Sequence, residues 1–179
     1  MEFDRVYESK NNFMEKTLRN EAAFKKLKEM AEDIRFCMFC TIGYAGTISS
    51  RPMTTSEVDE EGDIWFFTNK LSEVSIEADQ KNDVCLAYAC PNDNDYLSVT
   101  GVASIVLNKA KIKELWKDSY KAWFPEGIND PELALIRVTP SNAEYWDSTS
   151  NKMVILFSMV KAALTGSRYN EGEHGKLKL

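Results

Sequence analysis

The sequence predicts a mainly β protein, in which an antiparallel sheet or barrel is flanked by helices. Short strand-like runs follow one another at close spacing and are joined mostly by hairpin turns. The regular strand–helix alternation of a parallel dinucleotide-binding sheet is absent, and no glycine-rich nucleotide motif occurs. With 179 residues, the chain is most simply one domain around one core.

The first region, residues 1–34, is expected to hold an amphipathic helix over Phe13–Asp33, where apolar residues recur at helical spacing among charges. The second region, 35–147, is expected to form the barrel. Its predicted strands are 36–42, 47–57, 64–68, 84–90, 96–107 and 133–139, with 143–147 extending the sheet.

Turn and cap residues separate these strands. The sequence DEEGD supplies Gly62 for a hairpin turn with positive φ, and Gly101 predicts a bend or bulge within a long strand. A short helix is expected over Ser72–Gln80, and Asn108 is expected to cap a helix that reaches Ser119.

The third region, residues 148–179, is expected to contain a final helix over Ser150–Leu164. The polar tail after it, SRYNEGEHGKLKL, is expected to be loosely held. The longest apolar stretch, Met153–Val160, is shorter than the roughly 20 residues that span a bilayer. The N-terminal residues lack the apolar segment of a secretory signal, so a cytoplasmic location is the expectation.

Composition argues against several functions. A formal net charge of -6 disfavours general binding to nucleic acid or to anionic membranes, which require a basic surface. The four cysteines are expected to be buried reduced thiols, because the CMFC and CLAYAC runs look like strands without the turn that a zinc site needs; no metal site is predicted. His174 is the single histidine, so any catalysis is expected to belong to a bound cofactor rather than to a histidine-based triad.

The hairpin from Ser49 to Lys70 combines the residue types of an anion site. Arg51 offers a planar fork suited to phosphate, and Pro52 leaves the local ladder incompletely paired. Thr68 ends the next strand and Ser72 begins the next helix, so that their hydroxyls and the helix N-terminus could hold a phosphate.

The aromatic run Trp65, Phe66 and Phe67 could form the wall of a site for a flat ring system. The alternative is purely structural: Trp65 and Phe67 fill a core, while Arg51 makes a surface ion pair. The residues alone leave both interpretations open.

With these motifs, the chain resembles the pyridoxamine 5'-phosphate oxidase-like, FMN-binding split-barrel proteins, in particular their bacterial general stress protein branch. The matching motifs occur in order: SRPM at 50–53, IWFFT at 64–68, YLSVTGVASIV at 96–106, KIKELW at 111–116, AWFPEGINDPELALIRVTP at 122–140 and AEYWDS at 143–148. The resemblance implies a six-stranded antiparallel split β-barrel that works as a homodimer, with FMN in two clefts at the dimer interface.

The resemblance also implies roles for particular residues. Arg51 would contact the FMN phosphate, and Ser72 would add a hydroxyl to it. The backbone of Pro52, Met53 and Thr54 would run along the flavin, Phe67 and Thr68 would hold the flavin and its phosphate side, and Trp146 and Trp123 would approach from the partner subunit.

Two departures from the family pattern are visible. The family often has a phosphate-binding lysine where this chain has Val74, so that Lys70 would have to substitute for it or phosphate would be held less tightly. The arginine–histidine pair that holds the substrate of true pyridoxamine phosphate oxidases is missing after Trp146, where the sequence reads DSTSNK. Oxidation of vitamin B6 is therefore not expected.

The expected function is that of an FMN-dependent oxidoreductase with an unknown substrate, for which a reduced nicotinamide is a candidate electron donor. The alternative is a stress-related protein that binds or senses flavin without turnover. A third reading, haem in the barrel, is disfavoured by the single histidine.

Overall fold

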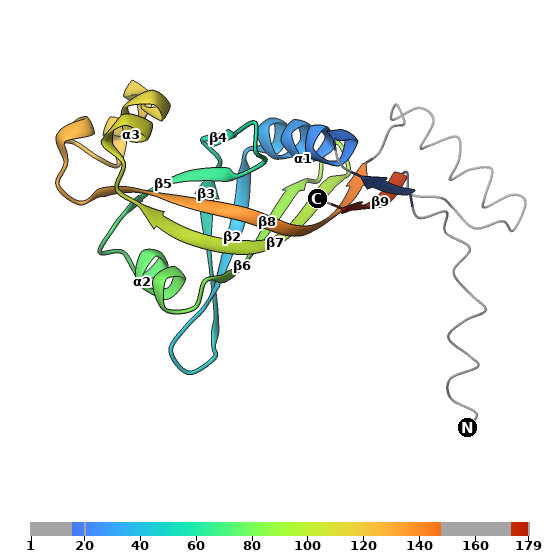
Figure 1. Ribbon diagram of the computed structural model, residues 1–179, viewed down its shortest axis with the longest axis horizontal. Coiled ribbons are helices and arrows are strands. Elements are labelled where there is room, and N and C mark those ends of the chain that lie inside the picture. Colours follow the sequence, from blue (N-terminus) through green and yellow to red (C-terminus); the bar gives the residue numbers. More distant parts are fainter. Residues whose placement is uncertain (1–15, 20, 148–172, 179) are drawn as a thin grey trace, which may run out of the picture.

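The computed structural model describes residues 16–19, 21–147 and 173–178, which form a strongly curled antiparallel sheet with three α-helices (Figure 1). The predicted helix over Ser150–Leu164 lies outside the described residues, as do residues 13–15 and 20 of the predicted first helix. The α-helices are α1 (Glu21–Ile34), α2 (Glu73–Gln80) and α3 (Lys109–Leu115), and two short 3-10 helices follow, η1 (Asp118–Ala122) and η2 (Gly127–Asn129).

The strands are β1 (Lys16–Arg19), β2 (Phe36–Ile42), β3 (Ile48–Thr54), β4 (Glu57–Val58), β5 (Ile64–Asn69), β6 (Asp83–Cys90), β7 (Asp95–Val106), β8 (Leu133–Asp147) and β9 (Glu173–Lys178). The six longer strands between β2 and β8 correspond to the predicted barrel strands, which confirms the split-barrel prediction.

The sheet is curled but does not close. Its strand order is β1-β9-β8-β7-β6-β2-β3, and β5 pairs with the first half of β8. Among the described strands, β3 pairs only with β2, and the side of β5 away from β8 pairs only with the two-residue strand β4. The edges of β3 and β5 therefore face each other across an opening. This opening, called the split below, positions the candidate site.

The core lies inside the curl of the sheet. Phe39 of β2 meets Phe66 of β5 edge to face, with ring centroids 5.3 Å apart, and Tyr145 is fully buried. Helix α1 contributes Leu27 to the same cluster, and α2 contributes Ala78. Both helices thus cover the apolar interior, and Figure 1 shows α1 and α2 on opposite sides of the long strands β7 and β8.

Three turn and cap predictions are confirmed. Gly62 has φ of 85°, a region that other residues rarely adopt. The β7–β8 register shifts between Thr100 and Gly101, where a Cβ on residue 101 would lie 2.4 Å from the Thr139 carbonyl oxygen. The Asn108 side chain caps α3 by accepting from two backbone N–H groups.

Two elements differ from the sequence prediction. The strand predicted over 47–57 stops at Thr54. The Thr55 N–H still donates to the Arg35 carbonyl in register with the β2–β3 pairs, but the Ser56 N–H donates to the Trp65 carbonyl and so leaves this ladder. Helix α3 ends at Leu115 instead of reaching residue 119. The 3-10 turns that follow allow the chain to bend back over β5.

The expectation of a loosely held tail is wrong for residues 173–178. These residues form β9, which pairs antiparallel with β8 and parallel with β1, and the Leu177 side chain is fully buried. Backbone pairing with two strands compensates for the polar sequence of this segment. The predicted first helix likewise begins only at Glu21, because Lys16–Arg19 is the strand β1 that completes this pairing.

The prediction of buried thiols holds only for Cys37. The other three cysteines are partly exposed, and all four are free. Cys40 and Cys85 occupy directly opposed positions of the β2–β6 pair. Burial raises the pKa of Cys37 to about 12, which makes it an unreactive core thiol. In the part of the chain that the structure describes, no helix has the length and apolarity needed to cross a membrane.

Candidate functional site

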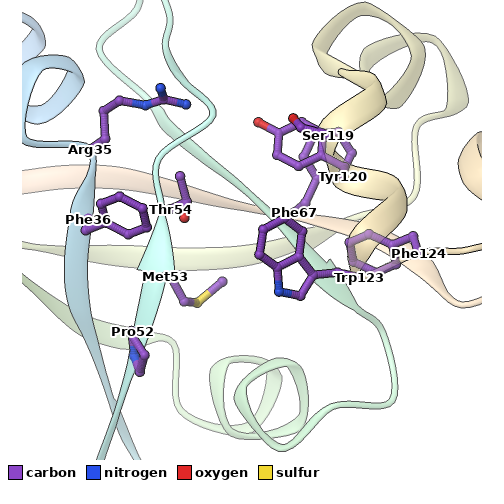
Figure 2. Close-up of a pocket in the computed structure, with 10 residues that line it drawn as sticks. All are labelled: Arg35, Phe36, Pro52, Met53, Thr54, Phe67, Ser119, Tyr120, Trp123 and Phe124. Carbon is purple, nitrogen blue, oxygen red and sulfur yellow. The ribbon is translucent and has the colours of Figure 1, made fainter.

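A pocket of about 550 Å³ lies in the split, between the edge of β3 and the turns that follow α3 (Figure 2). This volume falls within the range of small-molecule sites. The lining residues are Arg35, Phe36, Pro52, Met53, Thr54, Phe67, Ser119, Tyr120, Trp123 and Phe124. Five of the residues singled out in the sequence are thereby brought together, namely Pro52, Met53, Thr54, Phe67 and Trp123.

One wall of the pocket is aromatic. The Phe67 ring lies 4.5 Å from Tyr120 and 6.4 Å from Phe124, measured between centroids. Trp123 follows η1 directly and is 71% exposed. Figure 2 shows it beside Phe67, facing the gap toward β3. Trp123, expected to approach from a partner subunit, therefore lines the pocket of its own chain, because the turn after α3 folds back onto β5.

The opposite wall is the edge strand β3. Pro52, Met53 and Thr54 present backbone and side chains to the pocket. A proline fits an edge strand because it lacks a ladder donor. The backbone groups on the edge of β3 that points away from β2 have no strand partner among the described strands. They can form hydrogen bonds with a ligand.

Sequence reasoning missed Arg35 in this pocket. The residue follows α1 and has φ of 63°, a left-handed conformation that non-glycine residues seldom adopt. Figure 2 shows its guanidinium at the top of the gap, across from Ser119 and Tyr120. The nearest sequence signal is its place between a helix and a strand, which did not suggest a binding role.

The predicted hydroxyl residues meet at the start of α2. Thr68 Oγ1 lies 3.1 Å from Ser72 Oγ and 3.1 Å from Ser75 Oγ. Both serine hydroxyls donate to the Asn69 carbonyl at 2.7 Å, and the side chain of Ser72 makes no cap bond to the helix. Ser75, which sequence reasoning missed, completes this cluster.

Arg51 does not line the pocket. Its Nη2 donates to Glu77 Oε2 at 2.9 Å, and its Nη1 donates to Thr41 Oγ1 at 3.0 Å. The structural alternative for Arg51, an ion pair, is thus present in the structure, but the pair lies on the inner face of the β2–β3 ribbon against α2 rather than on the surface. Glu77 is only 8% exposed.

Two further predicted residues lie elsewhere. The Lys70 ammonium group donates to the Pro131 carbonyl at 2.8 Å on the exposed surface. Trp146, near the far end of β8, stacks on His174 of β9 with centroids 4.8 Å apart and lies opposite Tyr96 in the sheet. It does not line the pocket of its own chain.

The pKa of Glu77 is held below its usual value. The hydrogen bond from Thr41, together with those from Arg51 and Ser49, outweighs the opposing effect of burial. The folded protein therefore binds this proton less readily than the unfolded chain does. As the pH falls below about 4.3, the unfolded chain takes up the proton first, so the contribution of Glu77 to stability is lost on acidification.

We expect the difference in unfolding free energy between wild type and Glu77→Gln to be largest at neutral pH and to shrink below about pH 4.3. Urea unfolding from pH 7 to pH 3 measures it. Subtracting the variant removes the effects of the other carboxylates. A difference that stays constant or grows in acid would contradict an ionised Glu77 in the folded state.

Comparison with known proteins shows which family the sequence matches. The model of the family described as pyridoxamine 5'-phosphate oxidase like matches residues 22–170. Protein bli-3 of Neurospora crassa is 27% identical over 130 residues, which cover 68% of this chain and 62% of that protein. The chain thus spans less than two thirds of the length of this fungal relative.

Solved structures share the fold. A structure from Jannaschia sp. CCS1, named for general stress protein 26, has a TM-score of 0.73 and 23% identity, and the match covers 87% of this chain and 97% of that one. The general stress FMN/FAD binding protein of Xanthomonas citri has a TM-score of 0.61 and 28% identity over 72% of this chain and 90% of that one.

Proposed function

Because the chain belongs to the pyridoxamine 5'-phosphate oxidase-like family, we propose that it binds FMN non-covalently in the split of its sheet and acts as an oxidoreductase. The observation that carries the proposal is the pocket between β3 and η1, with an aromatic wall on one side and an open strand edge on the other. The relative from Xanthomonas citri, which is named as an FMN/FAD binding protein, supports the choice of cofactor.

The residues of the pocket fit the ring of a flavin. Phe67 and Trp123 offer apolar surface to a flat heterocycle. The β3 edge beside Pro52 and Met53 offers backbone groups to the polar rim of such a ring. Bound FMN would supply hydride or single-electron transfer, while these side chains would orient the ring and exclude water from it.

A second candidate function is flavin binding without turnover. The pocket lining contains no carboxylate, lysine or histidine, and its ionisable groups are Arg35 and the Tyr120 phenol. A site with so few acid–base groups also suits storage or sensing of flavin. Reduction by a nicotinamide distinguishes the enzyme proposal from the binding proposal. If the protein is an oxidoreductase, NADH or NADPH reduces bound FMN faster than free FMN. If it only binds flavin, the two rates are the same.

The binding proposal is tested by titrating purified protein with FMN and following flavin fluorescence. We expect Trp123→Ala to weaken FMN binding by about tenfold, because one aromatic contact with the ring is lost. The fold should remain intact, since Trp123 is largely exposed. Tyr44→Ala is the matched control: this aromatic side chain is 94% exposed and lies in the β2–β3 turn outside the pocket.

Failure of the wild-type protein to take up FMN would refute the proposed function. Equal loss of affinity in the Tyr44 and Trp123 variants would place the flavin outside the split. Oxidation of vitamin B6 is not proposed, because DSTSNK follows Trp146 where the substrate-binding pair of true pyridoxamine phosphate oxidases is expected.

We further propose that the protein is a homodimer, as the family resemblance implies. The outer face of the sheet exposes a row of apolar side chains on neighbouring strands, which runs from the pocket toward the far end of β8. Its members are Phe36, Met38, Pro52, Ala87, Ala89, Tyr96 and Trp146. A second copy packed on this face would cover the open side of the pocket beside Phe36, and Trp146 could then approach the site of the partner.

A further inference from the structure

The cation expected to hold the FMN phosphate already has a partner within the chain. Arg51 and Glu77 form an ion pair with 2.9 Å between Nη2 and Oε2, and their side chains are 22% and 11% exposed. Screening by water is weak at such a site. A phosphate would therefore have to compete with a fixed carboxylate for the same guanidinium.

Hydrogen bonds and close packing fix the position of the Glu77 carboxylate. Its Oε2 accepts from Thr41 at 2.5 Å, and its Oε1 accepts from Ser49 at 3.1 Å. Gly43 packs so closely that a Cβ there would lie 3.0 Å from Oε1. These contacts come from β2, β3 and the turn between them, so the β2–β3 pair determines where the carboxylate lies.

The start of α2 supplies no compensating cation. Glu73 lies one turn before Glu77, and its carboxylate is 4.0 Å from the same guanidinium. Lys70 donates to a backbone carbonyl instead, and residue 74 is a valine. Arg51 thus faces two carboxylates, the exposed Glu73 and the buried Glu77. The field of the buried Glu77 in particular disfavours a phosphate dianion beside this guanidinium.

We propose that Glu77 is a specificity-determining residue that neutralises Arg51, so that the pocket binds riboflavin nearly as well as FMN. This inference rests on the proposed function, because it assumes that the ring occupies the split. The aromatic wall and the β3 edge supply most of the binding. Arg51 lies two residues before Met53 and on the same face of β3, so a group that extends from the pocket along this face meets the Arg51–Glu77 pair.

The test compares FMN and riboflavin as probes in fluorescence titrations at one ionic strength. For the wild-type protein we expect their dissociation constants to agree within about tenfold. Glu77→Gln keeps the shape and a hydrogen-bond acceptor but removes the charge. It should tighten FMN binding by about tenfold and change riboflavin binding by less than about twofold.

Glu73→Gln is the matched control, since it removes a carboxylate near the same guanidinium whose side chain is 80% exposed. It should change FMN binding by less than about threefold, because water and salt screen it. Thermal unfolding confirms that each variant is folded. The comparison of FMN with riboflavin on the wild-type protein tests the inference without any substitution.

A wild-type preference for FMN above about hundredfold would overturn the inference, as would a Glu77→Gln variant with an unchanged ratio of the two constants. If Arg35→Ala abolishes such a preference, the phosphate binds at the α1–β2 end instead. Tight FMN binding without riboflavin binding overturns this inference and leaves the proposed function intact, whereas uptake of neither flavin refutes both.

Discussion

Arg51→Ala is expected to lower the free energy of unfolding by about 3 kcal/mol. The substitution leaves Glu77 as a buried carboxylate without its cation, and it removes the guanidinium N–H that donates to the Thr41 hydroxyl oxygen. Removing one partner of a buried ion pair typically costs about 3–5 kcal/mol, and the partial exposure of Arg51 places this case near the lower limit. Urea unfolding at neutral pH measures the loss.

The double variant Arg51→Ala/Glu77→Gln should recover more than half of this stability, because no unpaired charge remains buried. Lys121→Ala is a control for an exposed ion pair, with Asp118, and should leave the unfolding midpoint unchanged. If Arg51→Ala is as stable as wild type, the pair with Glu77 is not formed in solution. The sequence left both a phosphate contact and a surface ion pair open for Arg51, and the structure shows an ion pair with a buried carboxylate.

Phe36→Glu is expected to raise the dissociation constant of the proposed dimer by about hundredfold or more. Phe36 is 65% exposed, starts β2 and lies at the mouth of the pocket. In a twofold-symmetric interface the same change occurs twice, so two carboxylates would lose water at once. Sedimentation velocity over a series of protein concentrations measures the shift from dimer to monomer.

Flavin affinity provides a second readout, since loss of the partner would uncover the pocket and weaken FMN binding in parallel. Tyr44→Glu introduces the same charge on an exposed aromatic of the β2–β3 turn and should leave the dimer intact. A wild-type protein that is monomeric at all concentrations would refute the dimer proposal. A dimeric Phe36→Glu variant would place the interface elsewhere.

Much of the fold could be predicted because its signals are local. Short apolar runs marked β2 and β6, and alternating apolar residues marked β7. Gly62, Gly101 and Asn108 marked a turn, a bulge and a cap. Strand β9 escaped prediction because EHGKLK has no apolar alternation. Its strand conformation depends on pairing with β8 and β1, which are distant in sequence.

In the candidate site, too, some residues could be predicted from local sequence and others could not. Pro52, Met53, Thr54 and Phe67 could be predicted because they lie on two strands that are close in sequence, β3 and β5, and match family motifs. These two strands do not pair with each other as the hairpin expected from the sequence would require. The pairing of Arg51 with Glu77 could not, since 26 residues separate them and a carboxylate on a helix is ordinarily a solvated surface charge. The placement of Arg35 also depends on how the end of α1 meets the split.

The pairing of β1 with β9 has a consequence for synthesis on the ribosome. Residues 16–19 emerge early, but their partner strand is not made until residues 173–178 have been translated. Until then, the edge of β8 from Ala143 onward is unprotected, and unpaired strand edges promote association between nascent chains. Completion of this edge must therefore follow translation of β9, so that a chain arrested before residue 173 would expose it permanently.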